Sequence, residues 1–186
     1  MSVKNAIENL KMEMKKEGIL PETGLGNDMF LFSSTLAPVV NVDLLSTNQR
    51  QQILLAWRND PHSGIGWHIP GGCVRFKETL EERIQKTAVA EIGTHIQYDK
   101  EPIKVFEIFS DGYRKELEDQ RARAHFITLV YQCRIPQDWE INKHTTNPGE
   151  AGYLKWFDAL PEDLLAVQNC YRVCWHEISN RLWGKI

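Results

Sequence analysis

The stretch GWHIPGGCVRFKETLEERIQKTAVAEIGTH, which runs from Gly66 to His95, decides the fold that we expect for this chain. An apolar segment leads into the pair Gly71–Gly72, and a helix is predicted from about Thr79 to Ile92. One stripe of that helix is formed by Leu80, Ile84 and Ala88. The stretch therefore predicts a strand, a glycine turn and a helix in succession.

The glycine turn and two glutamates of this stretch indicate a site for a metal-bound phosphate. Pro70–Gly71–Gly72 is expected to end the strand in a tight turn that bares backbone carbonyls and amides. Glu78 stands at the start of the helix, and Glu91 stands roughly three and a half turns further along. A glycine carbonyl and a helical carboxylate suit a hard cation such as Mg²⁺. On composition alone, a β-turn before a surface helix with solvated acids is the simpler reading.

The whole pattern resembles the Nudix box, Gly-x5-Glu-x7-Arg-Glu-U-x-Glu-Glu-x-Gly-U, in which U is a bulky aliphatic residue. Gly72, Glu78, Glu91 and Gly93 match the box at the family's spacing. The resemblance implies a Nudix-type α/β/α sandwich with a mixed β-sheet. It spans roughly residues 38–160 and includes the segments APVVNVDLL, LLAWRND, AHFITLVY and GYLKWF.

The box is degenerate in a particular way. Lys86 replaces its arginine, Thr87 the next glutamate and Ala90 the first of the paired glutamates, and Thr94 replaces the last aliphatic residue. In this respect the chain is most similar to the GDP-mannose mannosyl hydrolase branch, whose box also lacks those acids. With few acids to hold several metal ions, attack on the sugar C1–O bond is favoured over attack on phosphorus.

The rest of the chain reads as one domain with an added N-terminal segment. We expect residues 1–37 to form a helix and a linker, and residues 38–186 to form an α/β domain that ends in a helix from about Pro161 to Trp183. Val3, Ile7, Leu10 and Met14 form an apolar stripe on the N-terminal helix. The stripe fits packing on its own domain, and it also fits the homodimer that the resemblance implies.

Composition narrows the range of partners. The net charge is −3 and there is no long run of Lys or Arg, which argues against nucleic acid or an anionic membrane as the main partner. The four cysteines lack the spacing of a disulfide scaffold, and the N-terminus has no apolar run of signal-peptide length. We therefore expect a cytoplasmic protein that binds a small molecule.

The resemblance also implies roles for particular residues. By position, Gly72, Glu91 and Glu150 correspond to the ligands of the divalent ion, Mg²⁺ or Mn²⁺. Arg58 corresponds to the arginine that steadies the leaving diphosphate, although a surface arginine at a strand end is the alternative. Asp43 corresponds to an aspartate that assists the leaving group, against the alternative of a solvent-facing acid.

The resemblance does not identify the general base, because Ala151 occupies the position of the family's base histidine. His144 lies in the same loop and is the best substitute, although a lone loop histidine is more often merely exposed. His125 is expected to be a core or wall residue, and Cys170, Cys174 and His176 lack zinc spacing.

Together these residues predict a Mg²⁺-dependent hydrolase of a nucleoside diphosphate sugar, similar to GDP-mannose, with Arg58, Asp43, Glu78 and His144 as its catalytic residues. Two alternatives stay open. One is P–O cleavage of a nucleoside diphosphate derivative, and the other is a domain that binds a nucleotide sugar without turnover.

Overall fold

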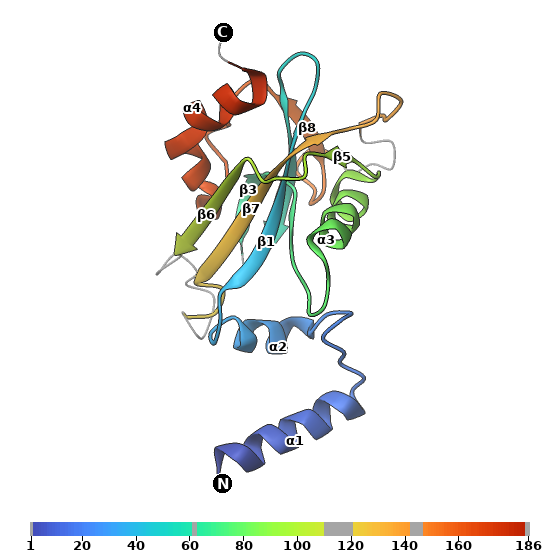
Figure 1. Cartoon of the computed structure of the whole chain (residues 1–186), viewed down its shortest axis with the longest axis vertical. Helices are drawn as coiled ribbons and strands as arrows, with labels where there is room; N and C mark the ends of the chain where they lie inside the picture. Colours follow the sequence, from blue (N-terminus) through green and yellow to red (C-terminus); the bar gives the residue numbers. More distant parts are fainter. Residues whose placement is uncertain (1, 61–62, 110–120, 142–146, 185–186) are drawn as a thin grey trace.

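A mixed β-sheet forms the body of the molecule (Figure 1). The computed structural model describes residues 2–60, 63–109, 121–141 and 147–184. Its strands are β1 (Val39–Thr47), β2 (Ile53–Asp60), β3 (Gly64–His68), β4 (Gly71–Cys73), β5 (Gln97–Tyr98), β6 (Lys104–Phe109), β7 (His125–Arg134) and β8 (Leu154–Phe157). The order is β3-β2-β1-β7-β5, with β4 on β1, β6 on β7 and β8 on β2. Only the β1–β7 pair is parallel among the described pairings.

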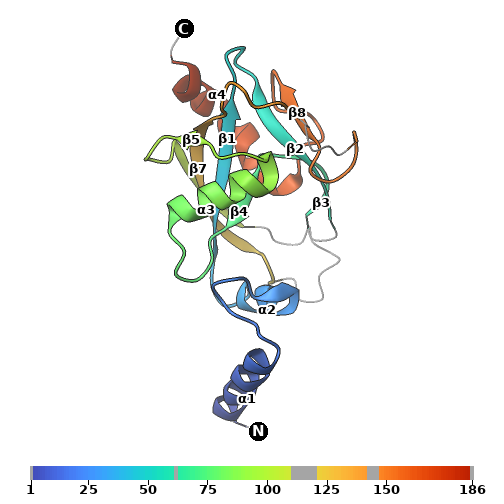
Figure 2. The ribbon, with the colours of Figure 1, turned by 90° about the vertical axis from the view of Figure 1, so that its right-hand side faces the viewer.

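Helices cover both faces of the sheet, as Figures 1 and 2 show. The helices of the described residues are α1 (Val3–Lys16), α2 (Gly26–Ser33), α3 (Leu80–Thr87), the π-helix η1 (Ala88–Ile92), the 3-10 helix η2 (Ala166–Gln168) and α4 (Cys170–Trp183), and α3 and α4 cover the two faces. Ile84, Ala88 and Ile92 pack in one core cluster, and Tyr171, Ile178 and Leu182 of α4 pack in the other.

The central strand β1 explains this layering. Leu44 belongs to the core cluster under α3 and Leu45 to the cluster under α4, and both are fully buried. Successive side chains of a strand point to opposite faces, so a strand that is apolar at adjacent positions is covered on both sides. The predicted α/β sandwich with a mixed sheet is confirmed.

The predicted turn at Gly71 and Gly72 is wrong. Gly71 and Gly72 continue the sheet as β4, paired with Asp43 and Val42 of β1. The reason for glycine is close packing. A Cβ on Gly72 would lie 2.4 Å from Thr87 Oγ1, and one on Gly71 would lie 2.3 Å from Asp43 Oδ1. The glycines therefore let α3 and the Asp43 carboxyl approach the backbone of β4 directly.

The helices also differ from expectation at several points. The helix after Thr79 changes from α to π geometry at Ala88, and α2 begins within the segment that was expected to be a linker. The last helix begins at Cys170, later than expected, because residues 162–163 form a turn, Leu164 forms an isolated bridge with Trp67, and residues 166–168 form the 3-10 helix η2. In α1 no residue is buried, and Figure 1 shows this helix apart from the sheet.

No helix in the described ranges has both the length and the hydropathy of a membrane span.

Candidate active site

The Glu91 carboxylate sits where the π-helix η1 meets strands β2 and β3. Thr79 begins the preceding helix with a capping box, in which its side chain and that of Glu82 each accept the other's backbone N–H. The helix ends at Gly93, whose φ of 83° is left-handed and favours glycine. This segment brings Glu91 over the sheet with its side chain 24% exposed.

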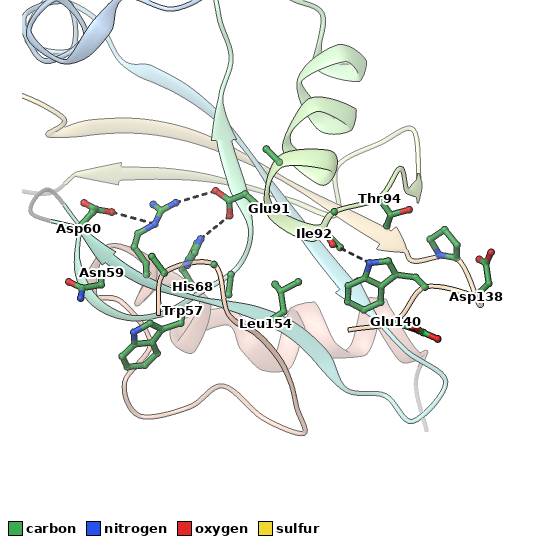
Figure 3. A pocket seen from close by; sticks show the side chains of 18 residues that line it. Trp57, Asn59, Asp60, His68, Glu91, Ile92, Thr94, Asp138, Glu140 and Leu154 are labelled. Atoms are coloured by element: carbon green, nitrogen blue, oxygen red, sulfur yellow. Dashed lines mark hydrogen bonds and ion pairs between the residues drawn. The ribbon is translucent and has the colours of Figure 1, made fainter. Parts of the chain in front are cut away.

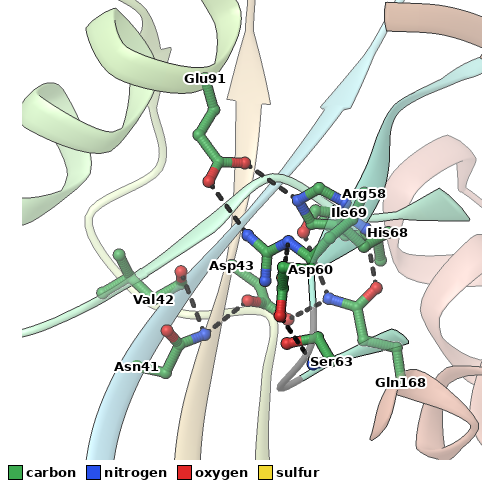
Figure 4. A network of polar contacts seen from close by, with 10 residues as sticks. All are labelled: Asn41, Val42, Asp43, Arg58, Asp60, Ser63, His68, Ile69, Glu91 and Gln168. Atoms are coloured by element: carbon green, nitrogen blue, oxygen red, sulfur yellow. Dashed lines mark hydrogen bonds and ion pairs between the residues drawn. The ribbon is translucent and has the colours of Figure 1, made fainter. Parts of the chain in front are cut away.

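Arg58 and His68 both bind Glu91 (Figures 3 and 4). Arg58 Nη2 donates to Glu91 Oε1 at 3.3 Å, and His68 Nε2 lies 3.0 Å from Glu91 Oε2. Burial raises the pKa of Glu91, but the hydrogen bond and charge of His68 and the charge of Arg58 outweigh it, so the pKa lies below its ordinary value. Glu91 is therefore ionised at neutral pH.

Asp43 forms a second, deeper part of the site. Its side chain is buried on β1, and it accepts hydrogen bonds from Asn41, Gln168 and Tyr171. Burial raises its pKa to about 7, although the hydrogen bonds from Tyr171 and Asn41 oppose that rise. Asp43 is thus a buried acid that is partly protonated near neutrality, and the solvent-facing alternative is ruled out.

Two hollows meet at Arg58 and His68, which line both of them. The larger has a volume of about 880 Å³ and includes Trp57, Trp139 and Glu91 in its wall (Figure 3). The smaller has a volume of about 220 Å³, and its polar lining comes from Asn41, Asp43, Arg58, Ser63, His68, Arg123, Thr128 and Gln168. The arginine guanidinium therefore stands between the larger hollow, whose wall combines tryptophan with acidic and amide side chains, and the smaller one.

The structure brings three of the predicted site residues together: Arg58, Asp43 and Glu91. The charges of Arg58 and Glu91 both act on Asp43. The fourth, Gly72, lies next to them and lines the smaller hollow.

Two other predicted residues have different partners. Glu78 receives two hydrogen bonds from Arg83, at 2.7 and 2.9 Å, and one from Lys86 at 2.9 Å, with its side chain only 4% exposed. Glu150 is exposed and accepts from the backbone and side chain of Asn147, both at 3.0 Å. Neither lines the two hollows, although Ala151, next to Glu150, does line the larger one. His144 lies outside the described residues.

The described donors fit a divalent ion that is shared with a substrate. No group of three or more His, Cys, Asp or Glu residues within the described ranges is arranged to hold a metal. Glu91 supplies one ionised carboxylate at the edge of the larger hollow. Mg²⁺ commonly binds proteins through one or two carboxylates while substrate phosphates and water complete its shell. A divalent ion at Glu91 would therefore take most of its remaining ligands from a bound molecule or from water.

His68, Gln168 and Tyr171 were not among the residues predicted from sequence. His68 lies in the buried part of a strand, between the apolar residues Trp67 and Ile69. A polar residue in such a strand is uncommon, so it could have been recognised from the sequence as a candidate functional residue. Gln168 and Tyr171 had no such sign, because they belong to a segment outside the resembling span and reach Asp43 only through folding.

Comparisons with known proteins agree with this architecture. Residues 37–168 match the model of the NUDIX domain family. The chain is 25% identical over 126 residues to the low-salt glycan biosynthesis protein Agl8 of Haloferax volcanii, which covers 68% of this chain and 78% of that protein. Among solved structures, a MutT NUDIX hydrolase from Burkholderia pseudomallei has 20% identity and a TM-score of 0.55, with 76% of this chain and 98% of that chain covered.

Another similar structure is a possible asymmetric diadenosine tetraphosphate hydrolase from Jonesia denitrificans. It has 16% identity and a TM-score of 0.55, with 81% of this chain and 99% of that chain covered. At such identities the solved structures inform on the fold alone.

Proposed function

The chain belongs to the Nudix family, and from that premise we propose that it is a Mg²⁺-dependent hydrolase of a nucleoside diphosphate sugar, GDP-mannose or a relative of it. The reaction proposed is substitution by water at C1 of the sugar, which releases a nucleoside diphosphate and the free sugar. The name of the Haloferax relative, a glycan biosynthesis protein, is in keeping with a sugar-linked substrate.

One observation carries the choice of substrate: the two hollows that meet at Arg58. Trp139 would offer aromatic surface to a base in the larger hollow, and the smaller one would offer a carboxyl, an amide and a hydroxyl to a sugar. A guanidinium at the junction matches the diphosphate that joins the two halves of such a ligand.

Cleavage of the sugar C1–O bond is proposed because of the residues that replace acids of the Nudix box. Thr87 is buried, with its hydroxyl packed where a Cβ of Gly72 would be, so this position offers no carboxylate to a metal. Lys86 faces Glu78. With one well-placed carboxylate, the site suits stabilisation of a departing diphosphate better than generation of a metal-bound hydroxide.

The residues have the following proposed roles. Glu91 would hold the divalent ion, with the carbonyl of Gly72 and the carboxylate of Glu150 as further oxygen donors, and the ion would supply positive charge beside the leaving diphosphate. Arg58 shares that charge. Asp43, partly protonated near neutral pH, gives a proton to the leaving group. His144 is the proposed base, and Glu78 contributes by holding α3 through Arg83 and Lys86.

The proposal is tested by incubating the purified protein with a panel of nucleotide sugars and Mg²⁺ and identifying the products. We expect a nucleoside diphosphate and a free sugar. Release of a nucleoside monophosphate and a sugar phosphate would assign the protein to the P–O cleaving class. Saturable binding of a nucleotide sugar with no product would instead identify a binding domain without turnover.

A further inference from the structure

A buried polar network joins the C-terminal segment to the candidate active site. Tyr171, in the first turn of α4, is fully buried, and its hydroxyl donates to Asp43 Oδ2 at 2.7 Å. Gln168, the last residue of η2, donates from Nε2 to the same oxygen at 3.3 Å. These donors are 128 and 125 positions from Asp43 in the sequence. The carboxyl on β1 thus depends on a distant segment for its partners.

Gln168 also bonds the backbone beside His68, as Figure 4 shows. The amide N–H of Ile69 donates to Gln168 Oε1 at 2.7 Å, and Gln168 Nε2 donates to the Ile69 carbonyl at 3.2 Å. Ile69 follows His68, whose ring binds Glu91. A single amide side chain therefore links the Asp43 carboxyl to the chain segment that carries the histidine.

The network is fixed by packing. The Tyr171 ring packs against Phe106 of β6 with ring centroids 4.9 Å apart, and α4 is held in the core by Ile178 and Leu182. A buried carboxyl without donors is strongly disfavoured, so these hydrogen bonds restrict Asp43 to one arrangement. Asn41 Nδ2 donates to the other oxygen, Oδ1, at 2.6 Å. The carboxyl is therefore held from both sides at the wall of the smaller hollow.

We propose that Tyr171 and Gln168 are positioning residues, which hold the Asp43 carboxyl and the backbone beside His68 in the arrangement that the reaction requires. The proposal rests on the proposed function, because it assigns Asp43 a part in leaving-group departure. Tyr171 and Gln168 act through Asp43 and Ile69.

The same network sets how readily Asp43 takes up a proton. The ionisable groups around it are Arg58, Arg123, His68, Cys73, Glu91, Cys170 and Tyr171. Burial raises the pKa of Asp43, and the Tyr171 hydrogen bond is the largest influence that lowers it. Removal of that hydroxyl should raise the pKa further, because the ionised form loses a donor.

The first test measures the network without any substrate. We expect the ¹³Cγ resonance of Asp43, identified by its loss in Asp43→Asn, to titrate at higher pH in Tyr171→Phe than in the wild type. Gln168→Met should speed hydrogen exchange of the Ile69 amide. The matched control is Tyr131→Phe, which alters a buried tyrosine in the other core cluster. An unchanged Asp43 titration in Tyr171→Phe would overturn the proposal.

The second test uses turnover of a nucleotide sugar. Tyr171→Phe should lower kcat roughly tenfold with KM little changed, because the Asp43 carboxyl loses the donor that holds it in position. The limb of the pH–rate profile that belongs to Asp43 should move in parallel with the NMR titration. A kcat and pH profile equal to those of Tyr131→Phe would overturn the positioning role. If the wild type cleaves no nucleotide sugar, the proposed function fails, and the NMR titration alone decides whether the network holds Asp43.

Discussion

Arg58 and Glu91, 33 positions apart in the sequence, approach to 3.3 Å between Nη2 and Oε1. Arg58 Nε also lies 3.5 Å from Asp60 Oδ2, so the guanidinium is held between two carboxylates at the junction of the two hollows. An incoming diphosphate would compete with these carboxylates for the same donors. Ligand binding at Arg58 should therefore release Glu91 to contact a divalent ion.

The substitution Glu91→Gln should lower kcat by at least about a hundredfold while the fold stays intact, because it removes charge at the proposed ion and keeps the shape of the side chain. Steady-state kinetics over a range of Mg²⁺ concentrations, with circular dichroism for the fold, provide the measurement. Glu101→Gln, an exposed position, is the control. Full turnover in Glu91→Gln would show that the ion is held elsewhere.

Hydrolysis in ¹⁸O-labelled water should place the label on the sugar and leave the nucleoside diphosphate unlabelled. The reason is that Thr87 and Ala90 occupy positions at which carboxylates would support attack on phosphorus. Mass spectrometry of both products reports the bond that was broken, with unlabelled free sugar incubated in parallel to correct for exchange at C1. Label in the nucleotide would assign P–O cleavage.

The loop that leads to β8 should decide the rate of the reaction. His144→Ala is expected to lower kcat by about 10²–10⁴-fold with KM little changed, which is the usual contribution of a general base. Glu150→Ala should raise the Mg²⁺ concentration needed for half-maximal rate, because it removes a proposed oxygen donor. His95→Ala changes an exposed histidine and serves as the control. Undiminished activity of His144→Ala would leave the base to a carboxylate such as Glu150.

Glu78 should stabilise the fold in a pH-dependent manner. Burial raises its pKa, but the hydrogen bonds from Arg83, the Arg75 backbone and Lys86 outweigh it and lower the pKa to about 2. A depressed pKa contributes stability that is present above the ordinary value of 4.5 and is lost as the pH falls towards about 2.

Glu78→Gln should therefore lower the free energy of unfolding at pH 7 by roughly 3 kcal/mol, because Arg83 keeps its charge without a partner. It should also flatten the loss of stability between pH 4.5 and about 2. Urea denaturation at several pH values measures both effects, and Glu81→Gln, on the exposed side of α3, is the control. Equal pH dependence of Glu78→Gln and the wild type would contradict this account.

The helix α1 should mediate a homodimer. Val3 and Ile7 are 77% and 47% exposed, so a stripe of apolar side chains stands open to solvent at a cost that association would remove. Multi-angle light scattering should give twice the mass of one chain, and Ile7→Asp should shift it to the monomer. Met12→Asp, away from the stripe, should not. A monomeric wild-type protein at working concentration would contradict the predicted homodimer.

The fold was largely predictable because its signs are local. Apolar runs located β1, β2, β7 and β8, and the stripe of Ile84 and Ala88 located α3. The two-residue strand β5 was missed because it is too short to show a period, and α2 was missed because its apolar residues, 29–32, are consecutive and form no helical stripe. The π geometry at Ala88 was also missed, because it leaves no sign in the spacing of side chains.

Three features of the site can be read directly from the chain: a glycine pair, one helical carboxylate in a depleted box, and an arginine at the end of an apolar strand. Which of these groups meet depends on the packing of the folded layers. That packing turned Asp43 inward to Tyr171 and Gln168, and placed His68 against Glu91. It also bound Glu78 and Glu150 to other partners. The physical reason is that spacing along a chain fixes local backbone geometry, whereas burial and hydrogen bonding between distant segments depend on how the layers pack.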